Sequence, residues 1–111
     1  MSDQAAIHRQ LKIKSGVASR LSKEHNLYRT EAEQQKRKLD KYIAENGDHW
    51  EVGNATRMLD EANRMIEDSA KRLGAAVDVL RAYIITVKKE PAFAEDDELK
   101  KAEEVLQMTS V

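Results

Sequence analysis

The sequence predicts an all-α fold: an elongated antiparallel three-helix bundle of two long helices and one short C-terminal helix, with coiled-coil-like packing. Three observations predict it. Apolar residues recur at alternating spacings of three and four along most of the chain. The 111 residues include only one proline and four glycines, so little interrupts the helices. Charged residues make up 35% and aromatic residues 5%, which favours a thin core and a single domain over residues 1–111.

The first long helix is predicted over about residues 3–45, with Ser2 or Asp3 as its cap. At about 1.5 Å per residue it would be a rod of about 60 Å. Its core row is Gln4, Ile7, Leu11, Lys14, Ala18, Leu21, His25, Tyr28, Ala32, Gln35, Leu39 and Tyr42. A second row is expected to widen the buried stripe and consists of Ile13, Val17, Leu27 and Ile43. Gly16 indicates close approach, either of a neighbouring helix or of a partner protein.

A turn is predicted at Glu45-Asn46-Gly47, with Gly47 as the left-handed residue that ends the helix. Asp48 and Glu51 then form a capping box for a second helix over about residues 48–88. Its core row is Val52, Ala55, Leu59, Ala62, Ile66, Ser69, Leu73, Ala76, Leu80, Tyr83 and Val87, widened by Met58, Met65, Val77 and Ile84.

Pro91 ends the second helix, because a residue that precedes proline is disfavoured in the helical region. A third helix is predicted over about residues 94–109, with Leu99, Ala102, Leu106 and Thr109 as its core row. Phe93 would fasten the preceding loop to the bundle. Since this helix is short, part of the surface of the long helices is expected to stay open to a partner.

The net charge of −1 hides an asymmetry along the chain. Residues 1–45 carry ten Lys/Arg against six Asp/Glu, whereas residues 91–111 carry two against six. The ends therefore attract each other, which favours folding of the last segment back onto the first. The basic residues alternate with acidic ones and have no accompanying aromatic row, which argues against a nucleic-acid partner.

No catalytic constellation is visible, and the protein is predicted not to be an enzyme. The absence of cysteine excludes disulfides, thiolate nucleophiles and Cys-ligated metals. None of the three histidines stands in a Glu-x-x-His pair, and His25, on the core row, is read as a hydrogen-bonded structural residue. No cofactor and no metal are expected. No stretch approaches the roughly 18 apolar residues of a membrane span, and no signal peptide is seen, so a soluble cytoplasmic protein is expected.

One set of residues resembles a known family, the tubulin-binding cofactor A family. The resemblance is colinear from about residue 9 to 85, and its KIKxGVxxRLxKE pattern with a downstream EAxQQ is more specific than a heptad repeat. The matching residues are Lys12-Ile13-Lys14-Ser15-Gly16-Val17, Arg20-Leu21, Lys23-Glu24, Tyr28, Glu31-Ala32-Glu33-Gln34-Gln35, Glu45-Asn46-Gly47, Met65-Ile66, Lys71-Arg72-Leu73 and Ala75-Ala76.

The resemblance implies a small three-helix-bundle chaperone. Such a protein captures and stores β-tubulin after its release from the cytosolic chaperonin and passes it on toward α/β-tubulin assembly, without nucleotide or catalysis. It implies a cytoplasmic, cytoskeleton-associated protein, as a monomer or a homodimer, that also meets other tubulin-folding cofactors. One position departs from the family, which commonly has a proline after the Met-Ile pair where this chain has Glu67. We therefore expect no bend above about 20° at residues 65–69.

The predicted partner-binding residues lie on the first helix, where the family pattern coincides with polar residues at or near the core row. They are Lys12, Lys14, Arg20, Lys23, Glu24, Tyr28, Glu31, Gln34 and Gln35. A basic helix suits a partner with an acidic surface. The same residues could instead form intrahelical pairs, such as Arg20 with Glu24, on a solvated face. The competing function is a self-associating coiled-coil adaptor or scaffold unrelated to tubulin.

Overall fold

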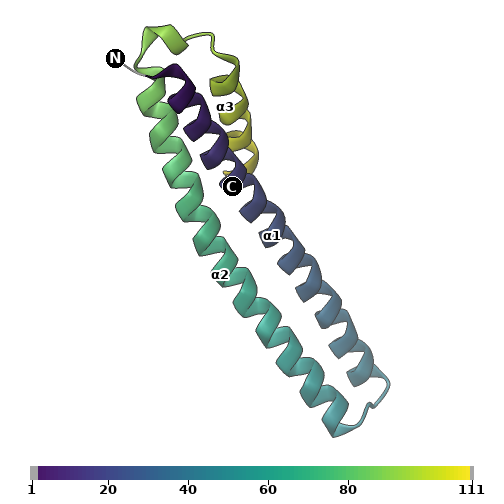
Figure 1. Cartoon of the computed structure of the whole chain (residues 1–111). Coiled ribbons are helices and arrows are strands. Elements are labelled where there is room, and N and C mark those ends of the chain that lie inside the picture. The colour runs from purple at the N-terminus through teal and green to yellow at the C-terminus, as the bar shows by residue number, and fades with distance from the viewer. Residues whose placement is uncertain (1–2, 111) are drawn as a thin grey trace. The chain divides into compact units, whose positions relative to one another are not determined.

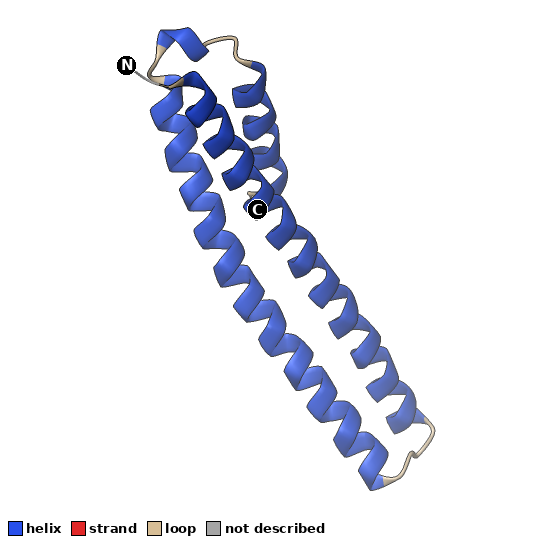
Figure 2. Ribbon diagram, viewed as in Figure 1, coloured by secondary structure: helices blue, strands red, loops and turns tan. Residues whose placement is uncertain are grey.

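The computed structural model describes residues 3–110 and contains three α-helices, α1 (Gln4–Ala44), α2 (His49–Lys88) and α3 (Asp97–Thr109) (Figure 1). A short 3-10 helix, η1 (Pro91–Phe93), lies between α2 and α3, and the described residues contain no strand (Figure 2). The all-α fold is confirmed. None of the helices in this part of the chain is both long and apolar enough to cross a membrane.

The chain divides into two compact units. The three-helix unit comprises Met1–Ser22 and Lys71–Val111, and so contains the N-terminal part of α1, the C-terminal part of α2, and α3. The two-helix unit, Lys23–Ala70, contains the rest of α1 and α2 and the turn that joins them, so its two helices are antiparallel.

The three-helix unit has a continuous apolar core with contributions from every helix. Its buried members are Leu11, Ala18, Leu80, Ile84, Val87, Phe93, Leu99 and Ala102, with Ile7, Tyr83, Val105 and Leu106 packed against them. Leu11 and Leu80 are 1% and 0% exposed, the values expected for opposed members of two core rows. Phe93 is 3% exposed, so it fastens the α2–α3 connection to the core as predicted.

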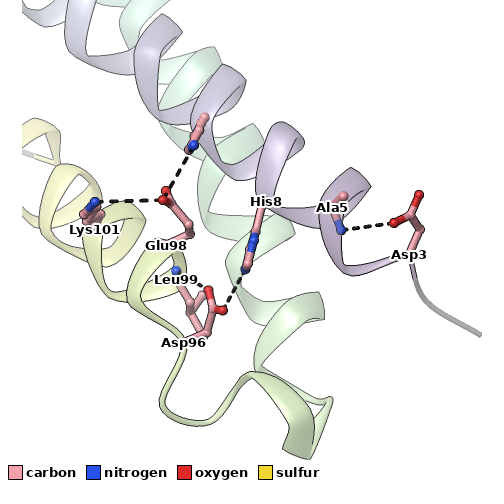
Figure 3. Close-up of polar contacts among 8 residues, drawn as sticks. Asp3, Ala5, His8, Asp96, Glu98, Leu99 and Lys101 are labelled. Carbon is pink, nitrogen blue, oxygen red and sulfur yellow. Dashed lines mark hydrogen bonds and ion pairs between the residues drawn. The ribbon is translucent and has the colours of Figure 1, made fainter.

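A polar cluster fixes the start of α3 against α1 (Figure 3). His8 Nε2 donates to Asp96 Oδ1 at 2.7 Å, while Asp96 Oδ2 accepts from the Leu99 backbone N–H at 3.0 Å and so caps α3. The His8 ring also meets Phe93 edge-on, with ring centroids 5.9 Å apart. Burial would raise the pKa of Asp96, but hydrogen bonds from His8 and the Leu99 N–H outweigh it and lower that pKa below its usual value.

Asp96 also explains why α3 begins at Asp97 and not at the predicted residue 94. Residues 91–93 form a 3-10 turn, and Asp96 has an extended backbone, as a capping residue requires. The expected attraction between the basic and acidic ends is seen in the ion pair of Lys12 with Glu98, at 3.7 Å.

The two-helix unit has a much thinner core. Its buried residues are Ala32, Ala55 and Ser69. His25 Nδ1 lies 2.8 Å from Ser69 Oγ, and the Ser69 hydroxyl donates to the Ile66 carbonyl at 3.0 Å. A hydroxyl has one proton to give, so His25 Nδ1 is the donor in its bond to Ser69. His25 is thus hydrogen-bonded, as predicted.

Half of the predicted second-row residues are exposed, and in the two-helix unit the number of helices gives the reason. In the two-helix unit, Leu27, Ile43 and Met58 are 56%, 57% and 48% exposed. A helix with a single neighbour buries one row of side chains, and the adjacent rows stay in water. Ile13, in the three-helix unit, is also half exposed, whereas Val77 and Ile84 are buried as predicted.

The turn between α1 and α2 corrects a second prediction. The left-handed residue is Asn46, with φ of 56°, and no described glycine has positive φ. The Gly47 N–H donates to the Tyr42 carbonyl at 2.7 Å and the Asn46 N–H to the Ile43 carbonyl at 3.2 Å, which is the Schellman pattern. Asn46 takes the left-handed position because asparagine tolerates it better than other non-glycine residues.

The start of α2 agrees with the predicted cap, since Asp48 Oδ1 accepts from the Glu51 N–H at 2.8 Å. Trp50, in the first turn of α2, is 69% exposed. Asp3 caps α1 by accepting from the Ala5 N–H at 3.0 Å, while the alternative cap, Ser2, lies outside the described residues (Figure 3). α2 runs through Glu67 without interruption. The expected absence of a bend above about 20° at residues 65–69 stays a prediction.

Candidate functional site

Grooves between helices are the main surface features of the three-helix unit. Residues of α3 line two of them, one against α1 and one against α2. Another groove is lined by residues of α1 and α2 alone. Among the described residues no group of three or more His, Asp or Glu side chains could hold a metal ion. The open surface of the long helices is the candidate binding surface.

The groove between α1 and α2, called here the α1/α2 groove, has a volume of about 380 Å³. Its walls are apolar apart from two basic side chains, and consist of Ile13, Lys14, Val17 and Leu21 from α1 and Arg72, Ala75, Ala76 and Val79 from α2. Ile13 and Val79 are 50% and 53% exposed, so an apolar wall on each helix faces solvent.

Lys14 has a defined position in this groove. Its ammonium group donates to Gln10 Oε1 at 2.8 Å and lies over the Tyr83 ring, 4.9 Å from the centroid. The polar residue in the core row of α1 is thus satisfied at the groove wall.

The other predicted site residues of the three-helix unit are exposed. Lys12 points toward α3 and pairs with Glu98, whereas Arg20 has no ion pair or hydrogen bond with any residue that the structure describes. The intrahelical alternative for Arg20 predicted a bond to Glu24, and none is found. Arg20 is thus an exposed cation of α1.

The predicted residues of the two-helix unit fall into two sets. Lys23, Glu31 and Gln34 are exposed, whereas Glu24, Tyr28 and Gln35 are half-buried. The Tyr28 hydroxyl donates to Glu24 Oε1 at 2.9 Å, so one pair within the predicted site is an intrahelical bond. The exposed set presents charged and amide groups to solvent, while Glu24 and Tyr28 bond to each other along α1.

Gly16 has no neighbour that needs it to be small. A Cβ atom built there would meet nothing within 4 Å, so close approach of a neighbouring helix does not explain this residue. Glycine in an exposed helix costs about 1 kcal/mol relative to alanine. The other explanation, approach of a partner protein, stays a prediction.

Sequence reasoning missed the α2 wall of the groove. Ala75 and Val79 stand outside the core row of α2, and Ala76 was placed in that row as plain core. The available signal was the apolar character of residues 75, 76 and 79 on the side of α2 that a short third helix leaves open. Periodicity alone could not decide which side that is.

Comparison with known proteins adds independent information. A sequence model of the family described as tubulin binding cofactor A matches residues 6–106. The chain is 40% identical to the rat tubulin-specific chaperone A and 39% identical to the human one over 98 residues, 88% of each chain. The solved structure of human tubulin chaperone cofactor A superposes with a TM-score of 0.79 at 36% identity, over 95% of this chain and 99% of that one. For the Arabidopsis thaliana tubulin folding cofactor A, the TM-score is 0.86 at 25% identity, over 96% and 97%.

Proposed function

The chain belongs to the tubulin binding cofactor A family, and on that premise we propose that it is a tubulin-folding chaperone. It captures and stores β-tubulin released from the cytosolic chaperonin and passes it on toward α/β-tubulin assembly. It does so in the cytoplasm by protein–protein binding, without catalysis, and it meets other tubulin-folding cofactors during transfer. The family match over residues 6–106 is the observation that carries this proposal.

The surface of α1 supports binding to another protein. It carries basic side chains with open surroundings, exposed apolar residues and a glycine with free space around it. A folding intermediate of tubulin exposes both apolar and charged surface, and both kinds of contact are available here. The proposed contact residues are Lys12, Lys14, Arg20, Lys23, Glu24, Tyr28, Glu31, Gln34 and Gln35.

The direct test mixes the purified chain with β-tubulin as it leaves the chaperonin. A soluble one-to-one complex on gel filtration is the expected result. Loss of all β-tubulin to aggregates, at chain concentrations well above that of tubulin, would refute the proposal. Sedimentation of the chain alone tests the adaptor alternative, which requires concentration-dependent self-association and no retention of tubulin.

Two paired charge reversals test the contact residues. Lys12→Glu with Lys14→Glu examines the residues beside α3 and the groove, and Arg20→Glu with Lys23→Glu examines two exposed cations of α1. Arg37→Glu with Lys38→Glu is the matched control, because it makes the same charge change at exposed positions of the same helix outside the predicted set.

We expect each test pair to weaken capture of β-tubulin by about tenfold, the usual scale for losing two charge contacts at a partly desolvated interface. The control pair should capture as the wild-type chain does. Since Lys14 also packs on Tyr83, thermal unfolding followed by circular dichroism must show that its variant is folded. Equal capture by test and control pairs would remove those residues from the site.

A further inference from the structure

The α1/α2 groove of the three-helix unit combines an open apolar floor with a basic rim. The floor comprises Ile13, Val17, Leu21, Ala75, Ala76 and Val79. The groove spans Ile13 to Leu21 on α1, a separation of eight residues, or about 12 Å at 1.5 Å per residue. That length matches about two turns of a helix.

The rim is basic on both sides. Arg9 lies four residues before Ile13 and Arg20 lies three after Val17, so both are surface neighbours of the α1 wall. On α2, Lys71 lies four residues before Ala75 in the same way. These three side chains are exposed and have no ion pair or hydrogen bond within residues 3–110.

Acidic side chains stand near this rim on both helices but outside the groove, since Glu24 lies four residues after Arg20 and Asp68 lies three before Lys71. No Asp or Glu lines the groove. On the other side of Ala75, Asp78 is three residues away and is paired with Arg81 at 3.0 Å. Lys14 adds a further positive charge in the α1 wall.

The geometry points to an amphipathic helix of the captured tubulin chain as the occupant of this groove, with two or three apolar side chains on the floor and carboxylates facing Arg9, Arg20 and Lys71. An apolar groove between two parallel walls is the usual receptor for an amphipathic helix. Since α3 already occupies another side of α1 and α2, the added helix would complete a four-helix arrangement in this unit. The inference rests on the proposed function and identifies the part of the surface, and the kind of segment, that would meet.

Val79 and Ile85 provide a matched pair of positions for the test. Both are apolar, both lie on α2, and both are 53% exposed. Val79 lines the α1/α2 groove, whereas Ile85 lines the groove between α2 and α3. Val79→Glu places a carboxylate on the floor and against the acidic side of the expected helix, and Ile85→Glu makes a comparable change elsewhere.

Val79→Glu should weaken retention of chaperonin-released β-tubulin by about tenfold, because like charges meet at an interface that excludes water. Ile85→Glu should retain β-tubulin as the wild-type chain does, and both variants should keep the wild-type helix content. If the wild-type chain retains β-tubulin and Val79→Glu does so equally well, the groove is not the site, although the proposed function stands. If the wild-type chain itself retains none, the proposed function fails first.

Photo-cross-linking identifies the occupant. With p-benzoylphenylalanine at position 79 or at position 85 of the full chain, only position 79 should cross-link to β-tubulin. The cross-linked peptide should come from a helix with an apolar row flanked by Asp or Glu. A cross-link from position 79 to a second copy of the chain, or to a β-tubulin segment without acidic residues, would overturn the inference.

Discussion

Asp96 shows how a single carboxylate can hold two segments that are distant in sequence. One of its oxygens caps α3 at the Leu99 N–H, and the other accepts from His8, which lies 88 residues earlier in the chain (Figure 3). Each interaction alone is ordinary. Together they fix both the starting residue of α3 and its position against α1.

Removal of the Asp96 carboxylate should therefore lower the free energy of unfolding more than is usual for a residue at the end of a helix. We expect Asp96→Ala to lower the free energy of unfolding by about 2 kcal/mol, about half from the lost cap and half from the lost hydrogen bond to His8. Asp97→Ala, at the next position of the same helix turn, is the control and should cost much less, since Asp97 is exposed. Urea unfolding followed by circular dichroism measures the difference, and equal losses in the two variants would contradict this account.

The same residue makes stability depend on pH. The folded-state pKa of Asp96 lies below its ordinary value of 3.8, so its contribution is present above pH 3.8 and is lost as the pH falls through the lower folded-state pKa. Asparagine caps helices about as well as aspartate but cannot ionise. The stability difference between the wild-type chain and Asp96→Asn should thus shrink as the pH falls below 3.8. A stability difference that grows below pH 3.8 would show that the folded state does not lower the pKa of Asp96.

At the scale of an element, two adjacent residues of the α1–α2 turn have different structural roles. Asn46 supplies the left-handed conformation, while Gly47 supplies space. A Cβ atom on Gly47 would lie 3.0 Å from the Tyr42 carbonyl oxygen and 3.2 Å from the Tyr42 Cβ atom. The sequence prediction placed the turn correctly but was wrong in making Gly47 the left-handed residue.

Substitutions at these two positions should separate the effect of the left-handed conformation from the effect of the limited space. Asn46→Gly should leave the free energy of unfolding unchanged or raise it, because glycine accepts positive φ without strain. Asn46→Ala should lower it by about 1 kcal/mol, because alanine lacks the short polar side chain that lets asparagine tolerate the left-handed conformation. Gly47→Ala should also lower it, since backbone atoms of Tyr42 would have to move. Thermal unfolding of the three variants is the measurement, and a stabilising Gly47→Ala would show that the turn has room to spare.

At the scale of the whole molecule, the two units differ in how much apolar surface they bury. The three-helix unit has a continuous core that includes Leu11, Leu80, Phe93 and Leu99, whereas the described part of the two-helix unit buries two alanines and Ser69. Burial of a leucine or phenylalanine contributes about 1.5–3 kcal/mol, and burial of an alanine far less. Apolar burial therefore stabilises the parts of α1 and α2 in the three-helix unit more than the parts in the two-helix unit.

This difference should appear in amide hydrogen exchange. Amides of α1 and α2 within Lys23–Ala70 should exchange by local opening, well before amides around Leu11 and Leu80 exchange. Mass spectrometry of peptides from the native chain makes the comparison within one sample. Equal protection along the full length of both helices would mean that the chain opens as one cooperative body.

The sequence-based predictions were correct where the helical period alone decides which residues are buried. The core row of α1 runs through Leu11, Ala18 and Ala32, all buried, because alternating threes and fours return to one face of a helix. They failed where the number of neighbours mattered, as at Leu27 and Met58, since periodicity does not say how many helices surround a given turn. The His8–Asp96 bond was out of reach because local patterns do not pair residues from opposite ends of a chain. For the proposed binding site, residues of α1 could be named from sequence, but Ala75 and Val79 on the α2 wall of the groove could not.

The chain has one tryptophan, Trp50, and its indole is already in water in the folded state. Unfolding therefore changes the surroundings of this fluorophore little, and its emission is a poor gauge of stability. For the same reason a blue shift of that emission, seen when an optically silent ligand is added, would report contact near the α1–α2 turn without any label.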